Sequence, residues 1–166
     1  MQKKGALKKE AEACFGAGCF WGVQSVFDQT IGVLSTDVGF MGGNMKLDKE
    51  HPYPQVCTDT TGHAEVVYIK YDPKKVSYIK LVDIFFDLHD PTQKNRQGPD
   101  VGSQYRSVIF YYTSEQQKEA LEAIKRHQKK YKQHIVTIVE KASVFYRAEE
   151  YHQKYLAKRG QTTCHI

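Results

Sequence analysis

Apolar residues follow two alternating patterns along this chain, one typical of strands and the other typical of helices. Helical spacing of three or four residues links Phe20, Val23, Val26 and Phe27, and likewise Ile79, Val82, Phe85 and Phe86. Short apolar runs predict strands at residues 11–15, 33–39, 64–71, 105–112, 135–139 and about 142–146. Helices are predicted at residues 20–29, 77–88, 114–133 and 147–158.

Polar residues at two of these helix starts are suited to capping. Ser77 is expected to cap the second helix, and Ser114 with Gln117 forms a capping box at the start of the third. The periodicity of the third helix places Leu121 and Ile124 on its inward face.

The order of elements predicts an α+β fold in which helices pack on a mixed β-sheet. A β-α-β-β-α-β start is typical of a two-layer sandwich with a ferredoxin-like core. Two long loops, at residues 41–62 and 90–104, are expected to return to one end of the sheet and form a site there. No repeat or linker divides the chain, so a single domain is expected over residues 1–166. Gly160 ends the last helix, and a mobile tail is expected at about residues 160–166.

Composition and charge narrow the cellular setting. With 40% hydrophobic residues the chain is expected to be globular, and no apolar run is long enough for a membrane span. Residues 1–10 lack the apolar stretch of a secretory signal, so a cytoplasmic location is expected. The net charge of +5 arises largely from a basic cluster at residues 118–132. Because no base-reading motif accompanies that cluster, it indicates a solvated helix face and no nucleic-acid partner.

One cysteine lies in an unusual local setting. The segment Gly16-Ala17-Gly18-Cys19-Phe20-Trp21-Gly22 places Cys19 at the turn between the first predicted strand and the first helix. Backbone N–H groups at a helix N-terminus favour the thiolate, which is the nucleophilic form of cysteine. Phe20 and Trp21 would form an apolar wall beside the sulfur. The alternative is a buried cysteine that packs as a small apolar side chain.

Three segments together resemble the peptide methionine sulfoxide reductases of the A type. They are GCFWG (18–22), TGHAEVV (61–67) and HDPTQKNRQGPDVGSQYRS (89–107), and the similarity extends over about residues 11–158. The resemblance implies an enzyme that converts the S-epimer of methionine sulfoxide, free or in proteins, to methionine. It also implies thioredoxin as the reductant, and no metal or other cofactor is expected.

The resemblance also implies a role for each matching residue. Cys19 is expected to attack the sulfoxide sulfur, and Glu65 is expected to protonate its oxygen. The aromatic pair after the cysteine would hold the S-methyl group, while tyrosine hydroxyls would hydrogen-bond the oxygen. The residues expected to bind substrate are Phe20, Trp21, Tyr53, Asp100 and Tyr105.

The other cysteines are assigned by their surroundings. Attack by Cys19 would leave a sulfenic acid, which condenses with a second thiol. Cys164 is the candidate for that resolving thiol, because it lies in the polar tail after Gly160. Cys14 and Cys57 are expected to be buried, since each follows an apolar neighbour or lies in a predicted strand.

Three other interpretations remain open at this point. His63-x-Glu65 matches half of a zinc deaminase signature, but the P-C-x-x-C half is absent, so no metal site is expected. A thiol peroxidase would also pass through a cysteine sulfenic acid. A peptide-binding module could use Phe20, Trp21 and the tyrosines to bind apolar side chains without chemistry.

Overall fold

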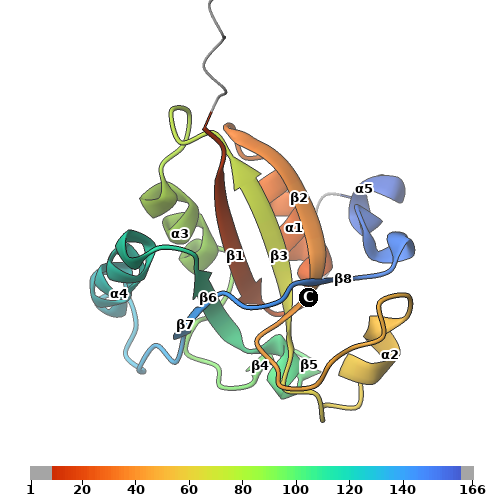
Figure 1. Cartoon of the computed structure of the whole chain (residues 1–166). Helices are drawn as coiled ribbons and strands as arrows, with labels where there is room; N and C mark the ends of the chain where they lie inside the picture. Colours follow the sequence, from red (N-terminus) through yellow and green to blue (C-terminus); the bar gives the residue numbers. More distant parts are fainter. Residues whose placement is uncertain (1–8, 162–166) are drawn as a thin grey trace, which may run out of the picture.

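The computed structural model describes residues 9–161, which form a six-stranded mixed sheet with helices packed on it (Figure 1). The strand order is β7-β6-β1-β3-β2-β8, and the pairs are antiparallel except for β6 with β7. The bounds are β1 Ala11–Ala17, β2 Val33–Met41, β3 Ala64–Tyr71, β6 Ser107–Tyr111, β7 Ile138–Lys141 and β8 Tyr146–Arg147. The predicted α+β class is confirmed, and the first four long strands have the order of a ferredoxin-like core.

Three longer helices cover one face of this sheet, while one short helix and a small hairpin lie at its lower end in Figure 1. The longer helices are α1 Phe20–Asp28, α3 Tyr78–Asp87 and α4 Ser114–Gln128. The short helices are α2 Pro52–Val56 and α5 Tyr155–Lys158, with 3-10 turns η1 Ser103–Tyr105 and η2 Glu150–His152. A separate two-stranded hairpin consists of β4 Arg96–Gln97 and β5 Asp100–Val101.

The main core lies between the helices and the sheet. Phe15 of β1 lies at its centre, with its ring centroid 5.5 Å from that of Phe27 and 5.2 Å from that of Phe85. All three side chains are fully buried. Aromatic packing of this kind contributes through buried area and ring geometry, so this contact fixes α1 and α3 against β1.

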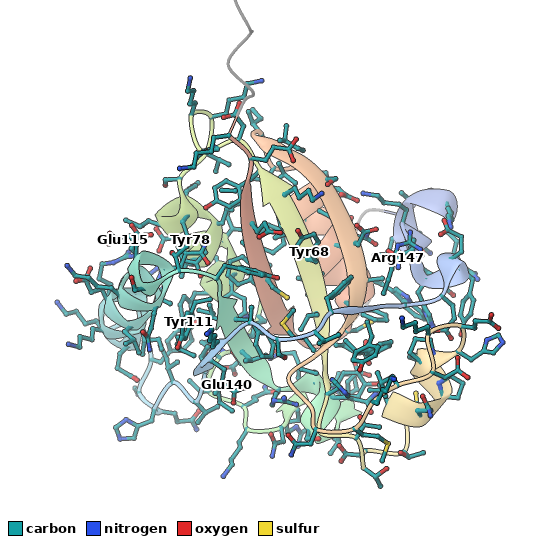
Figure 2. All side chains as sticks on the ribbon, viewed as in Figure 1. Tyr68, Tyr78, Tyr111, Glu115, Glu140 and Arg147 are labelled. Atoms are coloured by element: carbon teal, nitrogen blue, oxygen red, sulfur yellow. The ribbon has the colours of Figure 1, made fainter. Side chains whose placement is uncertain are left out.

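A smaller core lies on the opposite face of the sheet, beneath residues 142–147, which we call the strap. The strap crosses the sheet from β7 to β8 (Figure 1), and its Ala142 and Phe145 pack against buried Cys14, Met41 and Phe110. Arg147 at its end donates hydrogen bonds to Asp37 of β2 at 3.0 Å and to Glu150 at 2.9 Å (Figure 2). The strap therefore seals the face that the helices leave open.

Several predicted boundaries were wrong, and each has a local cause. The loop at 41–62 contains α2, and the loop at 90–104 contains the β4–β5 hairpin. The strand predicted from 105 begins at Ser107, because residues 103–105 form a 3-10 turn. The helix predicted at 147–158 is broken into η2 and α5, since Lys154 adopts a left-handed φ of 55°.

The C-terminal half of the chain departs further from the predicted bounds. The third helix ends at Gln128 and not at 133, because the Gln128 side chain bonds Gln133 O and Ile135 N in the loop that follows. The strand predicted at 135–139 is β7, which begins three residues later, at Ile138. Of the short strand predicted near 142–146 only the last residue is in a strand, β8, which begins at Tyr146.

The capping predictions were half right, and two residues expected to face inward do not. Ser77 accepts a hydrogen bond from Lys80 N as predicted, but α4 is capped by Thr113, which accepts from Gln116 N. Of the side chains expected on the buried faces of their helices, Ile79 and Leu121 are exposed. In α4 the small residues Ala120 and Ala123 are buried instead, so this helix approaches the sheet closely.

No helix within residues 9–161 is both long enough and apolar enough to cross a membrane.

Candidate active site

Cys19 lies at the turn between β1 and α1, as the sequence predicted, and is half-buried at the helix N-cap. Gly18 before it has a φ of +91°, which L side chains rarely adopt. A Cβ there would lie 2.8 Å from Cβ of Gln97, so the hairpin packs directly on this turn. The C-terminal end of β1 lies at the same end of the sheet as α2 and the hairpin (Figure 1). Both long loops therefore lie at the end of the sheet that carries Cys19.

Glu65 is the buried acid of this site. It lies on β3 opposite Phe40, with only 3% of its surface exposed. Its Oε1 accepts a hydrogen bond from the N–H of Phe20 at 3.5 Å, and its Oε2 accepts one from Gln104 at 3.1 Å. Because Phe20 directly follows Cys19, these bonds hold the carboxyl group beside the thiol.

The surroundings of Glu65 favour its protonated form. Burial raises the pKa of this carboxyl from 4.5 to about 7, although hydrogen bonds from Gln104, the Phe20 N–H and Tyr105 partly oppose the shift. The negative charge of Asp100 raises the pKa further. A carboxyl group that is part protonated near pH 7 can donate a proton to a bound group.

The two predicted tyrosines come together around this acid. Tyr53 is supplied by α2 and Tyr105 by η1, elements that are far apart in the sequence. Burial raises the pKa of both phenols, and the nearby charge of Glu65 raises them further. Both hydroxyls therefore remain protonated and can donate hydrogen bonds. Asp100 of β5 completes the group, since its charge acts on both Glu65 and Tyr105.

The two aromatic residues after Cys19 are held by contacts that the sequence did not indicate. The Phe20 ring is buried, with its centroid 5.6 Å from that of Phe40. Trp21 is half-buried and donates from Nε1 to Nδ1 of His152 at 3.1 Å. It also stacks on Tyr155, with ring centroids 3.7 Å apart. Trp21 and Tyr155 both line a groove of about 320 Å³ between α1 and α5.

The sequence profile described as "Peptide methionine sulfoxide reductase" matches residues 11–166 of this chain. The chain belongs to the peptide methionine sulfoxide reductase family. It is thus an oxidoreductase that acts on methionine sulfoxide, as its resemblance predicted.

Individual reductases agree with this assignment. The peptide methionine sulfoxide reductase MsrA of Methanoculleus marisnigri is 55% identical over 160 residues, which cover 95% of each chain. The structure of Mxr1 from Saccharomyces cerevisiae in reduced form has a TM-score of 0.87 at 37% identity, covering 92% of this chain and 87% of that one. The structure of Mxr1 in complex with Trx2 has a TM-score of 0.63 at 24% identity, covering 93% and 89%, and shows the shared fold.

The other cysteines of this reductase are placed only in part as predicted. Cys14 is fully buried beneath the strap, and burial raises the pKa of its thiol well above its usual range. The prediction that Cys57 is buried was wrong. Cys57 follows the last turn of α2 and is exposed, with its thiol against the Tyr53 hydroxyl. Cys164 lies outside the described residues.

His63, half of the incomplete zinc signature, is held by backbone contacts. Its Nδ1 accepts a hydrogen bond from Gly43 N at 3.0 Å, and its Nε2 lies 2.6 Å from Met45 O. Both ring nitrogens therefore bond backbone atoms of the loop after β2. Within residues 9–161 no group of three or more His, Cys, Asp or Glu side chains is placed to hold a metal ion.

Three residues of the site were missed from sequence. Gln104 bonds the acid directly, and its only sequence signal is its position next to Tyr105. His152 and Tyr155 support Trp21 from the C-terminal part of the chain. No pattern in the sequence connects residues about 130 positions apart, so their role is visible only in the fold.

Proposed function

We propose that this reductase converts the S-epimer of methionine sulfoxide, free and in proteins, to methionine through Cys19 and Glu65. The observation that carries the proposal is the position of the Glu65 carboxyl group. It accepts a hydrogen bond from the residue that follows Cys19, and its pKa lies near 7. A nucleophile and a proton donor for the same sulfur–oxygen group are thus adjacent.

The reaction transfers oxygen from the substrate to the protein. The Cys19 thiolate attacks the sulfoxide sulfur, while Glu65 donates its proton to the sulfoxide oxygen. The attack joins the two sulfur atoms, and the protonated oxygen then moves from the substrate sulfur to the Cys19 sulfur. As the sulfur–sulfur bond and the sulfur–oxygen bond of the substrate break, methionine leaves with its sulfur reduced and Cys19 remains as a sulfenic acid. The cysteine sulfur is oxidised by the two electrons that the substrate gains.

Substrate recognition needs both apolar and polar contacts. Phe20 and Trp21 are proposed to hold the S-methyl group, since both aromatic side chains follow Cys19 directly. Tyr53 and Tyr105 are proposed to hydrogen-bond the sulfoxide oxygen, which accumulates charge during attack. One methyl group in an apolar pocket contributes only about 1–3 kcal/mol of selectivity, so the polar donors supply the rest. Asp100 helps to keep Glu65 protonated.

Recycling is proposed to use Cys164 and thioredoxin. The Cys164 thiol attacks the Cys19 sulfenic acid, which forms a disulfide and releases water. Cys164 follows Gln161 by three residues, or about 10 Å of extended chain, and Gln161 lines the same groove as Trp21. The structure of Mxr1, a relative in fold and sequence, has been solved in complex with Trx2.

The proposed location of the chain is the cytoplasm, because a thiol reductant requires a reducing compartment. Immunoblotting of fractionated cells tests this location.

Removal of the Cys19 thiol is the decisive test. Cys19→Ser is expected to abolish reduction of the blocked S-sulfoxide of methionine, while equilibrium binding of that substrate is largely retained. Cys14→Ala is the matched control, because Cys14 lies beneath the strap on the opposite face of the sheet. Wild-type protein is expected to leave the R-sulfoxide unchanged. Turnover by Cys19→Ser, or faster turnover of hydrogen peroxide than of sulfoxide by the wild type, would refute the proposal.

A further inference from the structure

His152 is a buried histidine beside the active site that the proposed chemistry does not use. It is 1% exposed and lies in η2, within the C-terminal arm, which we define as residues 148–161. Four aromatic rings lie around the imidazole, with their centroids 4.1 to 5.7 Å from its own. These rings belong to Phe20, Trp21, Tyr53 and Tyr151.

The hydrogen bond to Trp21 determines the protonation state of this imidazole. An indole N–H can only donate, so Nδ1 of His152 must accept at the observed 3.1 Å and cannot carry a proton. The neutral ring then has its proton on Nε2, which is buried and has no hydrogen-bond partner among residues 9–161. A charged imidazolium would direct a second N–H at the indole N–H. Burial accordingly lowers the pKa of His152, against the opposing charge of Glu149.

The same arm also holds the face of the Trp21 ring. Tyr155 stacks on the indole at 3.7 Å with an interplanar angle of 7°, and the Arg159 guanidinium lies 4.2 Å from the centre of the Tyr155 ring. Trp21 is thus restrained at its edge by a hydrogen bond and on one face by stacking. A half-buried indole would otherwise be free to change its side-chain rotamer.

The arm is fixed to the sheet independently of Trp21. The Gln153 side chain donates to Val38 O and Ala148 O and accepts from Val38 N, at 2.9 to 3.0 Å. The backbone N–H of Lys154 donates to Gln24 Oε1 at 2.9 Å. His152 is therefore presented to Trp21 by a rigid support, which is the requirement for precise orientation of a neighbouring group.

We propose that His152 is a positioning residue that orients Trp21, and thereby the apolar pocket for the substrate, through the hydrogen bond at its Nδ1. This inference depends on one part of the proposed function, namely that Trp21 contacts the substrate. It assigns no chemical step to His152. Loss of this bond should weaken substrate binding more than it slows the chemical step.

A pair of variants of similar shape separates the hydrogen bond from packing. His152→Asn places an oxygen acceptor where Nδ1 was, whereas His152→Leu has a similar branched shape without an acceptor. His152→Leu is expected to raise KM for the blocked S-sulfoxide about 10-fold, the effect of one lost hydrogen bond. Its single-turnover rate at saturation should stay within about threefold of wild type. His152→Asn should restore KM to within about threefold.

Trp21 is the sole tryptophan of the chain, so its fluorescence gives a readout that needs no turnover. Quenching by acrylamide is expected to increase in His152→Leu and to stay near the wild-type value in His152→Asn. Equal KM and equal quenching in the Leu variant and the wild type would overturn the proposal. Inactive wild-type protein would instead contradict the proposed function and leave the fluorescence test intact.

A double-mutant cycle covers the case in which His152→Leu does not fold alone or loses activity through unfolding. Trp21→Phe removes the indole N–H, so His152→Asn and wild-type His152 should have the same KM in that background. His152→Gln, whose longer side chain displaces the acceptor, should raise KM in the Trp21 protein and not in the Trp21→Phe protein. Additive effects of Gln in both backgrounds would show that His152 acts on packing alone and would overturn the proposal.

Discussion

Glu65 shows how one residue acquires its chemistry from its surroundings. An isolated glutamate on a strand would be ionised at pH 7, and nothing in its local pattern distinguishes it from a solvated strand residue. Here it is buried beneath the turn of Cys19 and accepts two hydrogen bonds from N–H donors. Burial outweighs these bonds, and the pKa therefore rises to about 7. The resulting acid can act on a group next to the thiol.

The pH dependence of the first turnover should follow this carboxyl group. Because the protonated form is the active one, the single-turnover rate is expected to fall as the pH rises through about 7. Glu65→Gln should lower the rate by about 10²-fold or more and remove this pH dependence. Rapid quench with the S-sulfoxide between pH 6 and 9 measures both effects. Glu122→Gln, at an exposed position of α4, is the control and should match wild type.

The same shift has a consequence for stability, with a definite sign. The pKa of Glu65 is raised in the folded protein. Its contribution to the free energy of unfolding is therefore fully present below pH 4.5 and is lost as the pH rises through about 7. The loss amounts to roughly 3 kcal/mol for a shift of this size. Urea unfolding should thus show Glu65→Gln gaining stability over wild type above pH 7. A pH-independent difference between the two proteins would contradict the shifted pKa.

At the scale of elements, the site depends on two loops that bond each other near their tips. Asp59, just after α2, accepts hydrogen bonds from both the N–H and the hydroxyl of Ser103 at the start of η1. Arg106 donates to Gly62 O at 2.9 Å and to Ser103 O at 3.0 Å. These bonds join the element that carries Tyr53 to the element that carries Tyr105. The tyrosines are placed by this connection, since neither loop belongs to the sheet.

Loss of the Asp59 contact should impair catalysis more than stability. Asp59 is exposed and has a φ of 54°, a conformation that Asn also tolerates. Asp59→Ala is expected to lower kcat/KM about 10-fold by misplacing the tyrosines. The free energy of unfolding should fall by only about 1 kcal/mol. Asp59→Asn keeps an acceptor oxygen and should stay within about threefold of wild type in kcat/KM. Equal activity in the Ala variant would show that the two loops are fixed by other contacts.

The sequence predicted long elements better than short ones, for a physical reason. A helix such as α3 repeats its apolar face often enough to be recognised, and strand β3 is mainly apolar and buried along most of its length. By contrast, α2 has five residues and two prolines, and each strand of the β4–β5 hairpin has two residues. Such elements are held by contacts with the rest of the molecule, which no local pattern records.

The site residues divide in the same way. The environment of Cys19 could be inferred from its glycines and the helix that follows, whereas Glu65 and the tyrosines were identified through the family resemblance. His152 could not be found by either route, because its role depends on the arm that returns from the far end of the chain to Trp21. Cys57 was misplaced because an apolar neighbour, Val56, suggested burial that the end of α2 does not provide.

At the scale of the whole molecule, the C-terminal arm returns the end of the described chain to the catalytic end of the sheet. It packs on α1 and β2 through Gln153 and Lys154, and its last described residue lines the groove beside Trp21. Cys164, the proposed resolving cysteine, follows that residue by three positions in the sequence.

Removal of that thiol should separate the two halves of the cycle. Cys164→Ser is expected to release one equivalent of methionine at the wild-type rate and then to stop in the presence of thioredoxin and its reductase. Dithiothreitol should restore turnover, because a small thiol can reduce the sulfenic acid directly. Product release measured by chromatography over the first turnovers tests this. If Cys57→Ser stopped turnover and Cys164→Ser did not, Cys57 would be the resolving thiol.

The strap has one more consequence for an enzyme that works among oxidants. Met41 is fully buried in the small core beneath it, next to Phe110 and the strap residue Phe145. A sulfoxide at that position would place a polar S–O group among tightly packed apolar atoms. Met45, four residues further on, is 45% exposed and lacks this protection. By covering Met41, the strap shields this methionine of the reductase from the same oxidation that the enzyme reverses in its substrates.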